Sequence, residues 1–267
     1  MTLGRWGRAA LRTATALTLL FIYVPLGVIV LYAFNVNKVP TWPPTGLTLD
    51  WWGRAFESEE VRSALALSLE AALLATFIAL VLGTLASLAV QRYRFFGRET
   101  ISFLVLLPLA LPGIVTGMSL NAAFRTVGLE FGLFTIVVGH ATFCVVVIYN
   151  NVLARLRRTS RSIEEASTDL GADTWQTFRY VTFPVIRTAL LAGGLLAFAL
   201  SFDEVIVTTF TSGTQATLPI FILSNYLRPN QAPIVNVVAV IIVFLSIVPV
   251  YVASRLTGEA NSALGDR

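Results

Sequence analysis

The chain has 267 residues, of which 56% are hydrophobic and 13% are charged, and its net charge is +4. Soluble domains contain about 25% charged residues, so this chain has too little charge to cover the surface of a water-soluble globule. Its mean hydropathy of +0.76 indicates an integral membrane protein. A single cysteine and a single histidine exclude an internal disulfide, a cysteine cluster and a pair of histidine ligands, so no metal site is expected.

Six segments have the length and the apolar character of transmembrane helices. A helix needs roughly 20 mostly apolar residues to cross a bilayer, and continuous apolar runs without alternation exclude a membrane β-barrel. The first run follows a basic leader, but its apolar core exceeds the roughly 7–15 residues of a signal peptide, so we expect a retained helix. The predicted fold is all-α, with spans near residues 13–34, 66–90, 101–123, 131–153, 188–210 and 234–254.

The basic residues predict the orientation of these spans. With the N-terminus inside, the inner segments hold 14 of the 19 Lys and Arg residues and the outer segments hold five. Because cytoplasmic loops are enriched in Lys and Arg, both termini are expected on the cytoplasmic side of the cell (inner) membrane. The positive net charge then reflects topology, and no nucleic-acid partner is expected.

The outer segments are too short for a second globular domain. The loop 35–61 contains Trp42, Trp51 and Trp52 together with three prolines, and we expect it to lie at the membrane interface as an aromatic anchor. The predicted division of the chain is a first helix with its outer loop (1–60), a transmembrane domain (61–254) that includes an inner loop (155–187), and a cytoplasmic tail (255–267).

The inner loop predicts a first short helix near residues 163–170. Ser162 followed three residues later by Glu165 fits a capping box, in which each residue satisfies a free N–H group of the first turn. Gly171 lies where a left-handed residue ends a helix. Ile163 and Leu170 lie on one face of this helix and its acids on the other.

A second short helix is predicted after this glycine. Asp173 is placed to cap it, with Gln176 at its third position, and Pro184 is expected to end it before the next span. On physical grounds alone, the loop could equally lie on lipid headgroups, with Arg157, Arg158 and other basic residues touching anionic lipid.

The spacing within this loop resembles the EAA motif of ABC importer permeases. That motif is Glu-Ala-Ala, three residues, Gly, nine residues, and Ile-x-Leu-Pro. Here the matching residues are Glu165, Ala166, Ser167, Gly171, Val181, Thr182, Phe183 and Pro184, with conservative departures at Ser167, Val181 and Phe183. The segments 139–144 and 201–205 are similar to the second, C-type permease of spermidine/putrescine importers, and the resemblance covers most of residues 61–254.

The resemblance implies a permease subunit of a type I ABC importer that moves polyamines into the cytoplasm. Its implied partners are a second permease chain, two copies of a cytoplasmic ATPase and an extracytoplasmic substrate-binding protein, besides membrane lipid. The inner loop is then the coupling element that docks on the ATPase. The implied coupling residues are Glu165, Ala166, Ser167, Gly171, Val181 and Pro184. For Glu165, a role as helix cap alone stays open.

The chain lacks the residues for other activities. It has one lysine, Lys38, and no glycine-rich segment precedes it, so a nucleotide-binding P-loop is absent. We therefore expect no catalytic residue and no cofactor in this chain, with ATP bound by a separate ATPase. An intramembrane hydrolase would need a nucleophile beside a base, and His140 is better explained as a helix-packing residue. A secondary transporter remains an alternative class, and iron, sulfate-type anions and phosphonates remain alternative solutes.

Two features inside the spans are candidates for the substrate path. The stretch from Pro108 to Gly117 includes Pro112, and such irregular backbone is tolerated in a membrane where it lines a cavity or is packed by neighbours. Asp203 and Glu204 lie about 15 residues into the fifth predicted span, where an ionised group is costly unless it faces an aqueous path. A plain kink and a position at the outer interface are the respective alternatives. Glu70 receives no role.

Overall fold

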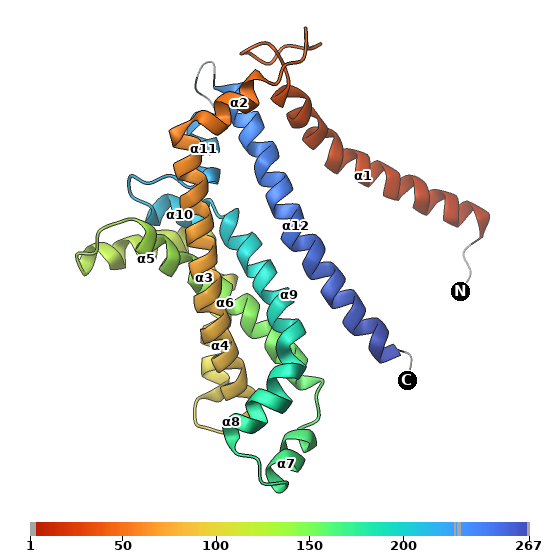
Figure 1. The fold of residues 1–267 in the computed structure, drawn as a ribbon, viewed down its shortest axis with the longest axis vertical. Coiled ribbons are helices and arrows are strands. Elements are labelled where there is room, and N and C mark those ends of the chain that lie inside the picture. The colour runs from red at the N-terminus through yellow and green to blue at the C-terminus, as the bar shows by residue number, and fades with distance from the viewer. Residues whose placement is uncertain (1–3, 227, 229–230, 266–267) are drawn as a thin grey trace. The chain divides into compact units, whose positions relative to one another are not determined.

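The computed structural model describes residues 4–226, 228 and 231–265, which fold as helices and connecting loops with one isolated antiparallel bridge, Asn35 to Leu47 (Figure 1). The elements in chain order are α1 (Arg5–Ala33), α2 (Asp50–Glu57), α3 (Glu59–Arg92), α4 (Arg98–Ala110), α5 (Gly113–Thr126), α6 (Leu133–Arg157), α7 (Ser162–Asp169), α8 (Thr174–Thr177), the π-helical turn η1 (Phe178–Thr182), α9 (Phe183–Phe202), α10 (Ile206–Thr211), α11 (Leu218–Asn225) and α12 (Ala232–Gly265). The prediction of an all-α chain agrees with these elements.

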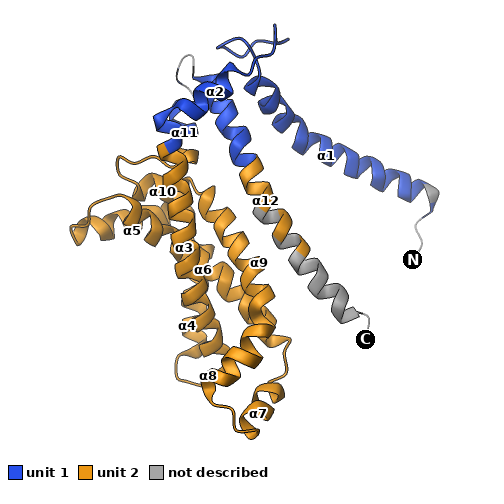
Figure 2. Ribbon diagram, in the orientation of Figure 1, with its two compact units in different colours: residues 1–62, 221–243 blue, residues 63–220, 244–267 orange. Residues whose placement is uncertain are grey.

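The chain forms two compact units (Figure 2). The first comprises residues 1–62 and 221–243, and the second comprises residues 63–220 and 244–267. The second unit holds both regions that the sequence singled out, the inner loop and the acid pair, and it is the unit that matters for the site.

Four helices are long and apolar enough to cross a membrane: Trp6–Ala33, Glu59–Arg92, Leu133–Arg157 and Thr174–Phe202. The pair α4 and α5 qualifies as a fifth span if its two helices are taken together, and the apolar part of α12 over Ala232–Val248 is shorter than these. Among the described residues there are thus four candidate spans by length and composition, or five with the bent pair. The sixth span stays a prediction.

The span predicted over residues 101–123 is interrupted, as its prolines indicated. It divides into α4 and α5, which are bent by 106° at a break that contains Leu111 and Pro112. A proline disfavours the helical conformation of the residue before it, and Leu111 is extended with φ −84° and ψ 143°. The proline therefore causes this break. Pro108, in contrast, remains inside α4.

The span predicted over residues 188–210 is wrong in its bounds. One continuous helix covers Thr174–Phe202, and α10 forms a separate helix after it. Pro184 does not end the second loop helix as expected but lies in the first turn of α9. The π turn η1 directly precedes it and rearranges the hydrogen-bond pattern, which lets the helix continue through the proline.

The core of the second unit is built around α6. Figure 1 shows α3, α6 and α9 running side by side, with α7 and α8 at one end of this bundle. Small residues let the helices approach closely, as is common in membrane bundles. A Cβ atom added at Gly83 of α3 would lie 2.8 Å from Ile148 Cβ of α6, and one at Gly193 of α9 would lie 3.3 Å from Asn151 Cβ. The buried residues here are Ala79, Cys144, Val147, Ile148, Val152, Leu156, Ile186 and Ala197.

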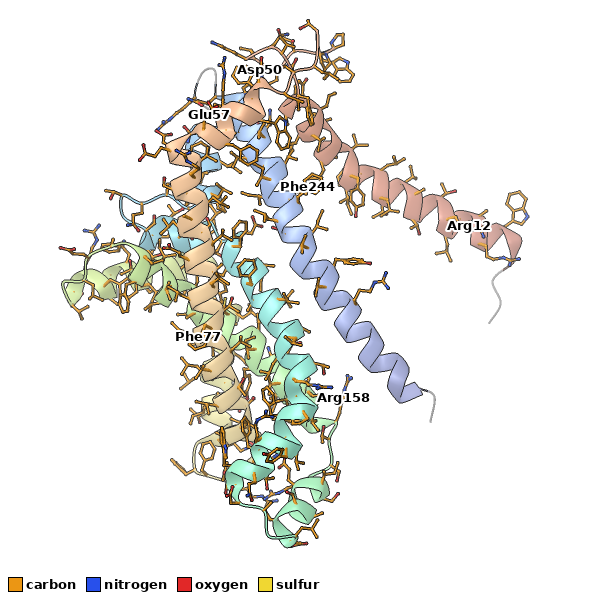
Figure 3. All side chains as sticks on the ribbon, viewed as in Figure 1. Arg12, Asp50, Glu57, Phe77, Arg158 and Phe244 are labelled. Atoms are coloured by element: carbon orange, nitrogen blue, oxygen red, sulfur yellow. The ribbon has the colours of Figure 1, made fainter. Side chains whose placement is uncertain are left out.

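Large apolar side chains cover the outside of this bundle. Phe77 of α3 is 65% exposed and projects away from its helix (Figure 3), and Phe103 of α4 and Leu191 of α9 are similarly exposed. In water such a surface would be unfavourable, whereas lipid tails solvate it without cost. The exposed side chains therefore agree with the membrane setting that the composition indicates.

The first unit buries part of the predicted aromatic loop. Trp51 is 7% exposed and packs with Ala33, Ala55 and Val237, and its Nε1 donates a hydrogen bond of 2.9 Å to the Asn35 carbonyl oxygen. The expectation of an interfacial anchor is therefore wrong for Trp51. Trp42, at 75% exposed, remains available for that role.

Candidate functional site

The first candidate region is the inner loop, where α7 begins one residue earlier than predicted. Arg161 is its N-cap with φ −66° and ψ −25°, and no side chain of that residue caps the helix. The Ser160 hydroxyl instead accepts a hydrogen bond of 3.2 Å from the Ser162 N–H. The predicted capping box of Ser162 and Glu165 is therefore wrong, because the backbone at Arg161 is already helical.

The end of α7 confirms the predicted role of Gly171. Its φ is +88°, which is the left-handed conformation that favours glycine. The Ala172 N–H donates to the Ser167 carbonyl at 3.1 Å, and the Gly171 N–H donates to the Thr168 carbonyl at 2.9 Å. These two bonds form a Schellman motif, which satisfies the free carbonyl groups at the helix end.

The start of α8 confirms the second predicted capping box. Asp173 Oδ1 accepts a hydrogen bond of 2.8 Å from the Gln176 N–H, and Gln176 Oε1 accepts one of 2.9 Å from the Asp173 N–H. Both ends of the turn between α7 and α8 are thus fixed by local hydrogen bonds, which hold α7 in a defined direction.

The tip of the loop exposes a surface with apolar side chains. Leu170 is 90% exposed, Trp175 is 68% exposed and Ile163 is 50% exposed. The predicted coupling residues Glu165, Ala166, Gly171 and Pro184 are also exposed, whereas Ser167 and Val181 are partly buried. The structure therefore brings the predicted coupling residues to one end of the bundle and leaves an uncovered surface there.

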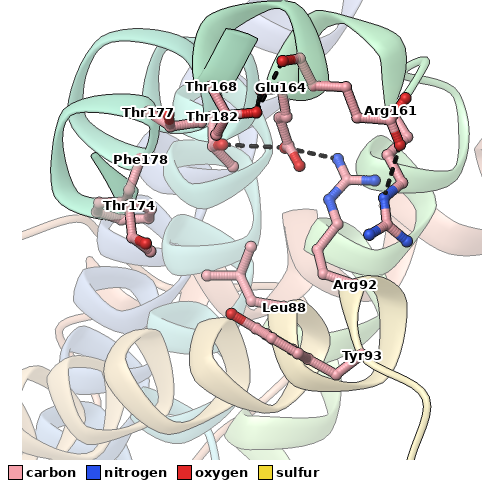
Figure 4. Close-up of a pocket in the computed structure, with 11 residues that line it drawn as sticks. Leu88, Arg92, Tyr93, Arg161, Glu164, Thr168, Thr174, Thr177, Phe178 and Thr182 are labelled. Atoms are coloured by element: carbon pink, nitrogen blue, oxygen red, sulfur yellow. Dashed lines mark hydrogen bonds and ion pairs between the residues drawn. The ribbon is translucent and has the colours of Figure 1, made fainter. Parts of the chain in front are cut away.

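A residue that the sequence reasoning missed lies at the centre of this region. Glu164 accepts from Arg92 Nη2 at 2.8 Å and from the Thr182 hydroxyl at 3.0 Å (Figure 4). The side chains of Arg92 and Glu164 are only 12% and 18% exposed. They line a pocket of about 280 Å³ together with Leu88, Tyr93, Thr168, Thr174 and Phe178 among others. The Glu-Glu repeat was visible in the sequence, but its partner is 72 residues away.

The second candidate region is the acid pair, which does not lie within a helix as predicted. Asp203 is the C-cap of α9, and α10 begins at Ile206. Glu204 Oε1 accepts a hydrogen bond of 2.9 Å from the Val207 N–H and so caps the first turn of α10. Asp203 is exposed, and within the described part of the chain no hydrogen bond of its carboxylate is found.

The two helix breaks meet in the second unit. A Cβ atom at Gly113, the first residue of α5, would lie 3.5 Å from Ile206 Cγ2, the first residue of α10. Further along, Asn121 Nδ2 donates a hydrogen bond of 2.6 Å to the Phe210 carbonyl. The predicted path residues Pro112 and Asp203 therefore belong to neighbouring breaks, while Pro108 lies four residues before Pro112 inside α4.

His140 holds this arrangement to the core. It is 1% exposed, and its Nδ1 lies 2.7 Å from the Ser201 hydroxyl while its Nε2 lies 2.8 Å from the Thr208 hydroxyl. Both ring nitrogens are therefore satisfied, one by α9 and one by α10. This geometry fits the predicted packing role, and it places His140 where it fixes α10 relative to α9.

Comparison with known proteins decides the family. Residues 79–258 match the model of the family described as "Binding-protein-dependent transport system inner membrane component". The chain belongs to this family. It is a transport permease, which agrees with the resemblance that the inner-loop motif indicated.

Known proteins that are at least 30% identical to this chain align with it over most of their own length. The chain is 37% identical over 231 residues to the putrescine transport system permease protein PotI of Escherichia coli K12, covering 83% of this chain and 81% of PotI. It is 30% identical over 243 residues to the spermidine/putrescine transport system permease protein PotC of Haemophilus influenzae, covering 90% and 93%. It is also 30% identical to the putative 2-aminoethylphosphonate transport system permease protein PhnV of Salmonella typhimurium, covering 85% and 86%.

Solved structures show the same fold. A bacterial ABC transporter involved in import of the acidic polysaccharide alginate matches with a TM-score of 0.72 at 17% identity, covering 95% of this chain and 96% of that chain. The MetNI methionine ABC transporter matches with a TM-score of 0.58 at 20% identity, covering 74% and 97%. The fold of this chain is thus that of ABC importer permeases.

Proposed function

We propose that this permease forms part of an ATP-driven importer that moves polyamines into the cytoplasm. The observation that carries the substrate class is the 37% identity to a putrescine permease over 81% of that protein, together with the 30% identity to a spermidine/putrescine permease over 93% of it. The chain itself supplies the pathway and not the hydrolysis of ATP, which belongs to a separate ATPase subunit. It needs no cofactor of its own.

The proposed assembly holds a second permease chain, two ATPase copies and an extracytoplasmic binding protein in the inner membrane. The alginate transporter that shares this fold was crystallised with a substrate-bound periplasmic protein. We propose six spans with both termini in the cytoplasm, and the placement of 14 of the 19 basic residues in the inner segments supports this orientation.

The proposed coupling element is the inner loop, with Glu165, Ala166, Ser167, Gly171, Val181 and Pro184 as its docking residues. Its support is the exposed surface of α7 and α8, where Leu170 and Trp175 are uncovered. Apolar side chains on a cytoplasmic loop are unfavourable in water, and burial against a partner subunit removes that cost.

The proposed substrate path passes the two helix breaks, with Pro108 and Pro112 shaping one and Asp203 next to the other. Since Glu204 already accepts the Val207 N–H, the contact with a cationic substrate is assigned to Asp203 and the charge of Glu204 adds to the field. A carboxylate attracts a protonated amine more strongly in a low-dielectric environment than in bulk water.

Uptake in the native host tests this function. The gene is deleted, and the deletion strain receives a vector that carries the wild-type gene, the Asp203→Asn variant or no insert. Accumulation of radiolabelled putrescine is then measured in each strain. We expect the wild type to restore uptake and the variant to restore at most about one tenth of it at equal protein level, because about 1.4 kcal/mol of lost attraction is a tenfold change.

The same cells distinguish the other solutes. Unlabelled spermidine is expected to compete with putrescine, whereas 2-aminoethylphosphonate is expected not to compete. If deletion leaves putrescine uptake unchanged and abolishes uptake of 2-aminoethylphosphonate, the polyamine assignment is wrong. The aminophosphonate is then the assigned solute.

A further inference from the structure

Two adjacent glutamates of α7 have opposite surroundings. Glu164 has a side chain that is 18% exposed, and it bonds to Arg92 at 2.8 Å and to Thr182 at 3.0 Å. Glu165 is 62% exposed, and among the described residues its carboxylate pairs with Arg161 alone, one turn away, at 3.3 Å. An exposed pair of that kind contributes little because water and salt screen it, whereas screening is weaker at a pair removed from water.

The Glu164 contacts join three elements that the sequence separates widely. Arg92 is the last residue of α3, Glu164 belongs to α7, and Thr182 is the last residue of the π turn that leads into α9. A single carboxylate oxygen, Oε1, accepts both hydrogen bonds. The inner ends of two candidate membrane spans are thus tied to the helix that carries the proposed docking surface (Figure 4).

The attachment of α7 to the bundle is otherwise slight. Ser167 lies 3.1 Å from the Thr177 hydroxyl in α8, and the other side-chain bonds of α7 that the structure shows stay within the loop and the adjoining turn. A displacement of α7 can therefore move α9 through the continuous backbone, whereas it can move α3 through the contact between Glu164 and Arg92. Hydrogen bonds between charged groups are stronger than those between neutral groups. The bond between Glu164 and Arg92 can therefore move the end of α3 when α7 is displaced.

We propose that Glu164 and Arg92 are positioning residues for the transport cycle, because their contact passes the movement of α7 to α3. The inference rests on the proposed function of the inner loop as the ATPase-docking element and does not depend on which solute is carried. Without the contact, α7 still binds the ATPase, but α3 no longer follows it.

The test uses the complete transporter in inside-out membrane vesicles and a reporter at the inner end of α3. Tyr93, which follows α3 directly and is 62% exposed, is replaced by cysteine in a Cys144→Ser background. The rate at which a water-soluble maleimide modifies this cysteine is measured with and without ATP. The variants are Glu164→Gln, Arg92→Gln and the charge exchange Arg92→Glu with Glu164→Arg.

Glu99→Gln is the matched control, because Glu99 is an exposed carboxylate on the same side of the proposed membrane, in the first turn of α4. We expect ATP to change the modification rate about fivefold in the wild type and in this control, a factor at the lower end of common coupling factors. In the two single variants we expect ATP to leave the modification rate unchanged. The amount of ATPase that co-purifies is expected to stay the same in all of them.

Rescue separates a positioning role from a structural one. The charge exchange restores the pair with its sign reversed, and we expect it to regain at least half of the ATP-dependent change. The inference is overturned if the single variants keep the wild-type change, if the exchange restores nothing, if the wild type shows no ATP-dependent change, or if the single variants lose the ATPase altogether. A transporter that takes up no putrescine but shows the expected pattern of rates refutes the polyamine assignment and leaves this inference standing.

Discussion

The inner loop and the helix break between α9 and α10 each contain two adjacent acids, and in both regions the two acids have different surroundings. In α7, Glu164 is bonded to Arg92 and Thr182 while Glu165 is exposed. At the break after α9, Glu204 bonds to the Val207 N–H while Asp203 is exposed. In each pair one carboxylate is bonded to another element or to the backbone, and the other is exposed; the exposed acids are the ones that we propose for the ATPase and the solute.

The physical reasons differ between the two regions. Glu164 and Glu165 are consecutive residues of one helix, so a rotation of about 100° points them to different faces. Asp203 and Glu204 lie between two helices, where the backbone of α9 has ended and the first free N–H groups of α10 need an acceptor. Adjacency in sequence therefore says little about a shared role, and the local backbone decides.

The largest expected effect concerns the end of α7. Gly171→Asp puts a β-carbon on a residue with φ +88° and a carboxylate on the proposed docking surface. We expect ATP-driven uptake to fall at least tenfold, which corresponds to about 1.4 kcal/mol, while the permease remains inserted. Uptake and the amount of permease in the membrane are the two measurements.

Gly97→Asp is the control for this substitution. Gly97 has φ +83°, lies on the same side of the proposed membrane and likewise has no atom within 4 Å of an added Cβ. The two variants carry the same backbone strain, so equal losses of uptake would show that strain alone is responsible and that the inner loop has no special role.

A smaller effect is expected where α5 packs on α10. A Cβ atom at Gly117 would lie 2.6 Å from Phe210 Cδ2, whereas one at Gly113 would lie 3.5 Å from Ile206 Cγ2, an ordinary contact. Gly117→Ala should therefore lower the free energy of unfolding by about 1–3 kcal/mol through overpacking, and Gly113→Ala should leave it nearly unchanged. Thermal unfolding in detergent measures both, and equal melting temperatures would contradict the packing of these helices.

The smallest effect separates the two acids of the break. Glu204→Ala removes the acceptor of the Val207 N–H and should cost about 1 kcal/mol, as the loss of a helix cap does. That corresponds to a melting temperature lower by about 2–4 °C. Asp203→Ala, which removes no such bond, should melt like the wild type. A lower melting temperature for Asp203→Ala than for Glu204→Ala would reverse the assignment of structural and functional roles.

Local signals in the sequence predicted the parts of the structure that local chemistry determines. The turn between the loop helices follows from Gly171 and from the Asp173–Gln176 capping box, and both appear as expected. The prolines also indicated an interruption in the span predicted over residues 101–123, and the helix breaks at Leu111 and Pro112. A glycine, a cap or a proline acts within a few residues of itself, which is why these signals were informative. The same kind of signal was wrong for the Ser162–Glu165 capping box and for the helix end expected at Pro184, where the neighbouring backbone was already helical.

Features that depend on distant residues could not be predicted. The partner of Glu164 lies 72 residues earlier in the chain. The EAA spacing singles out Glu165, but it gives no sign that Glu164 is the glutamate that bonds to α3. The break after Phe202 has no glycine or proline to mark it, and it is held by His140, whose ring bonds to Ser201 and Thr208 on either side. Tertiary contacts override local propensity at both positions.

The central claim is that the inner loop is where the ATPase acts on this permease. Ala166, an exposed residue of α7, is replaced by cysteine in a Cys144→Ser background and modified with a photoactivated cross-linker in inside-out vesicles of the complete transporter. Thr214→Cys in the same background is the control, because Thr214 is an exposed residue of the proposed outer side. The account predicts that the Ala166→Cys variant cross-links to the ATPase and that the Thr214→Cys variant does not. Cross-linking in the Thr214→Cys variant alone, or labelling of the Ala166→Cys variant from outside intact cells, would contradict it.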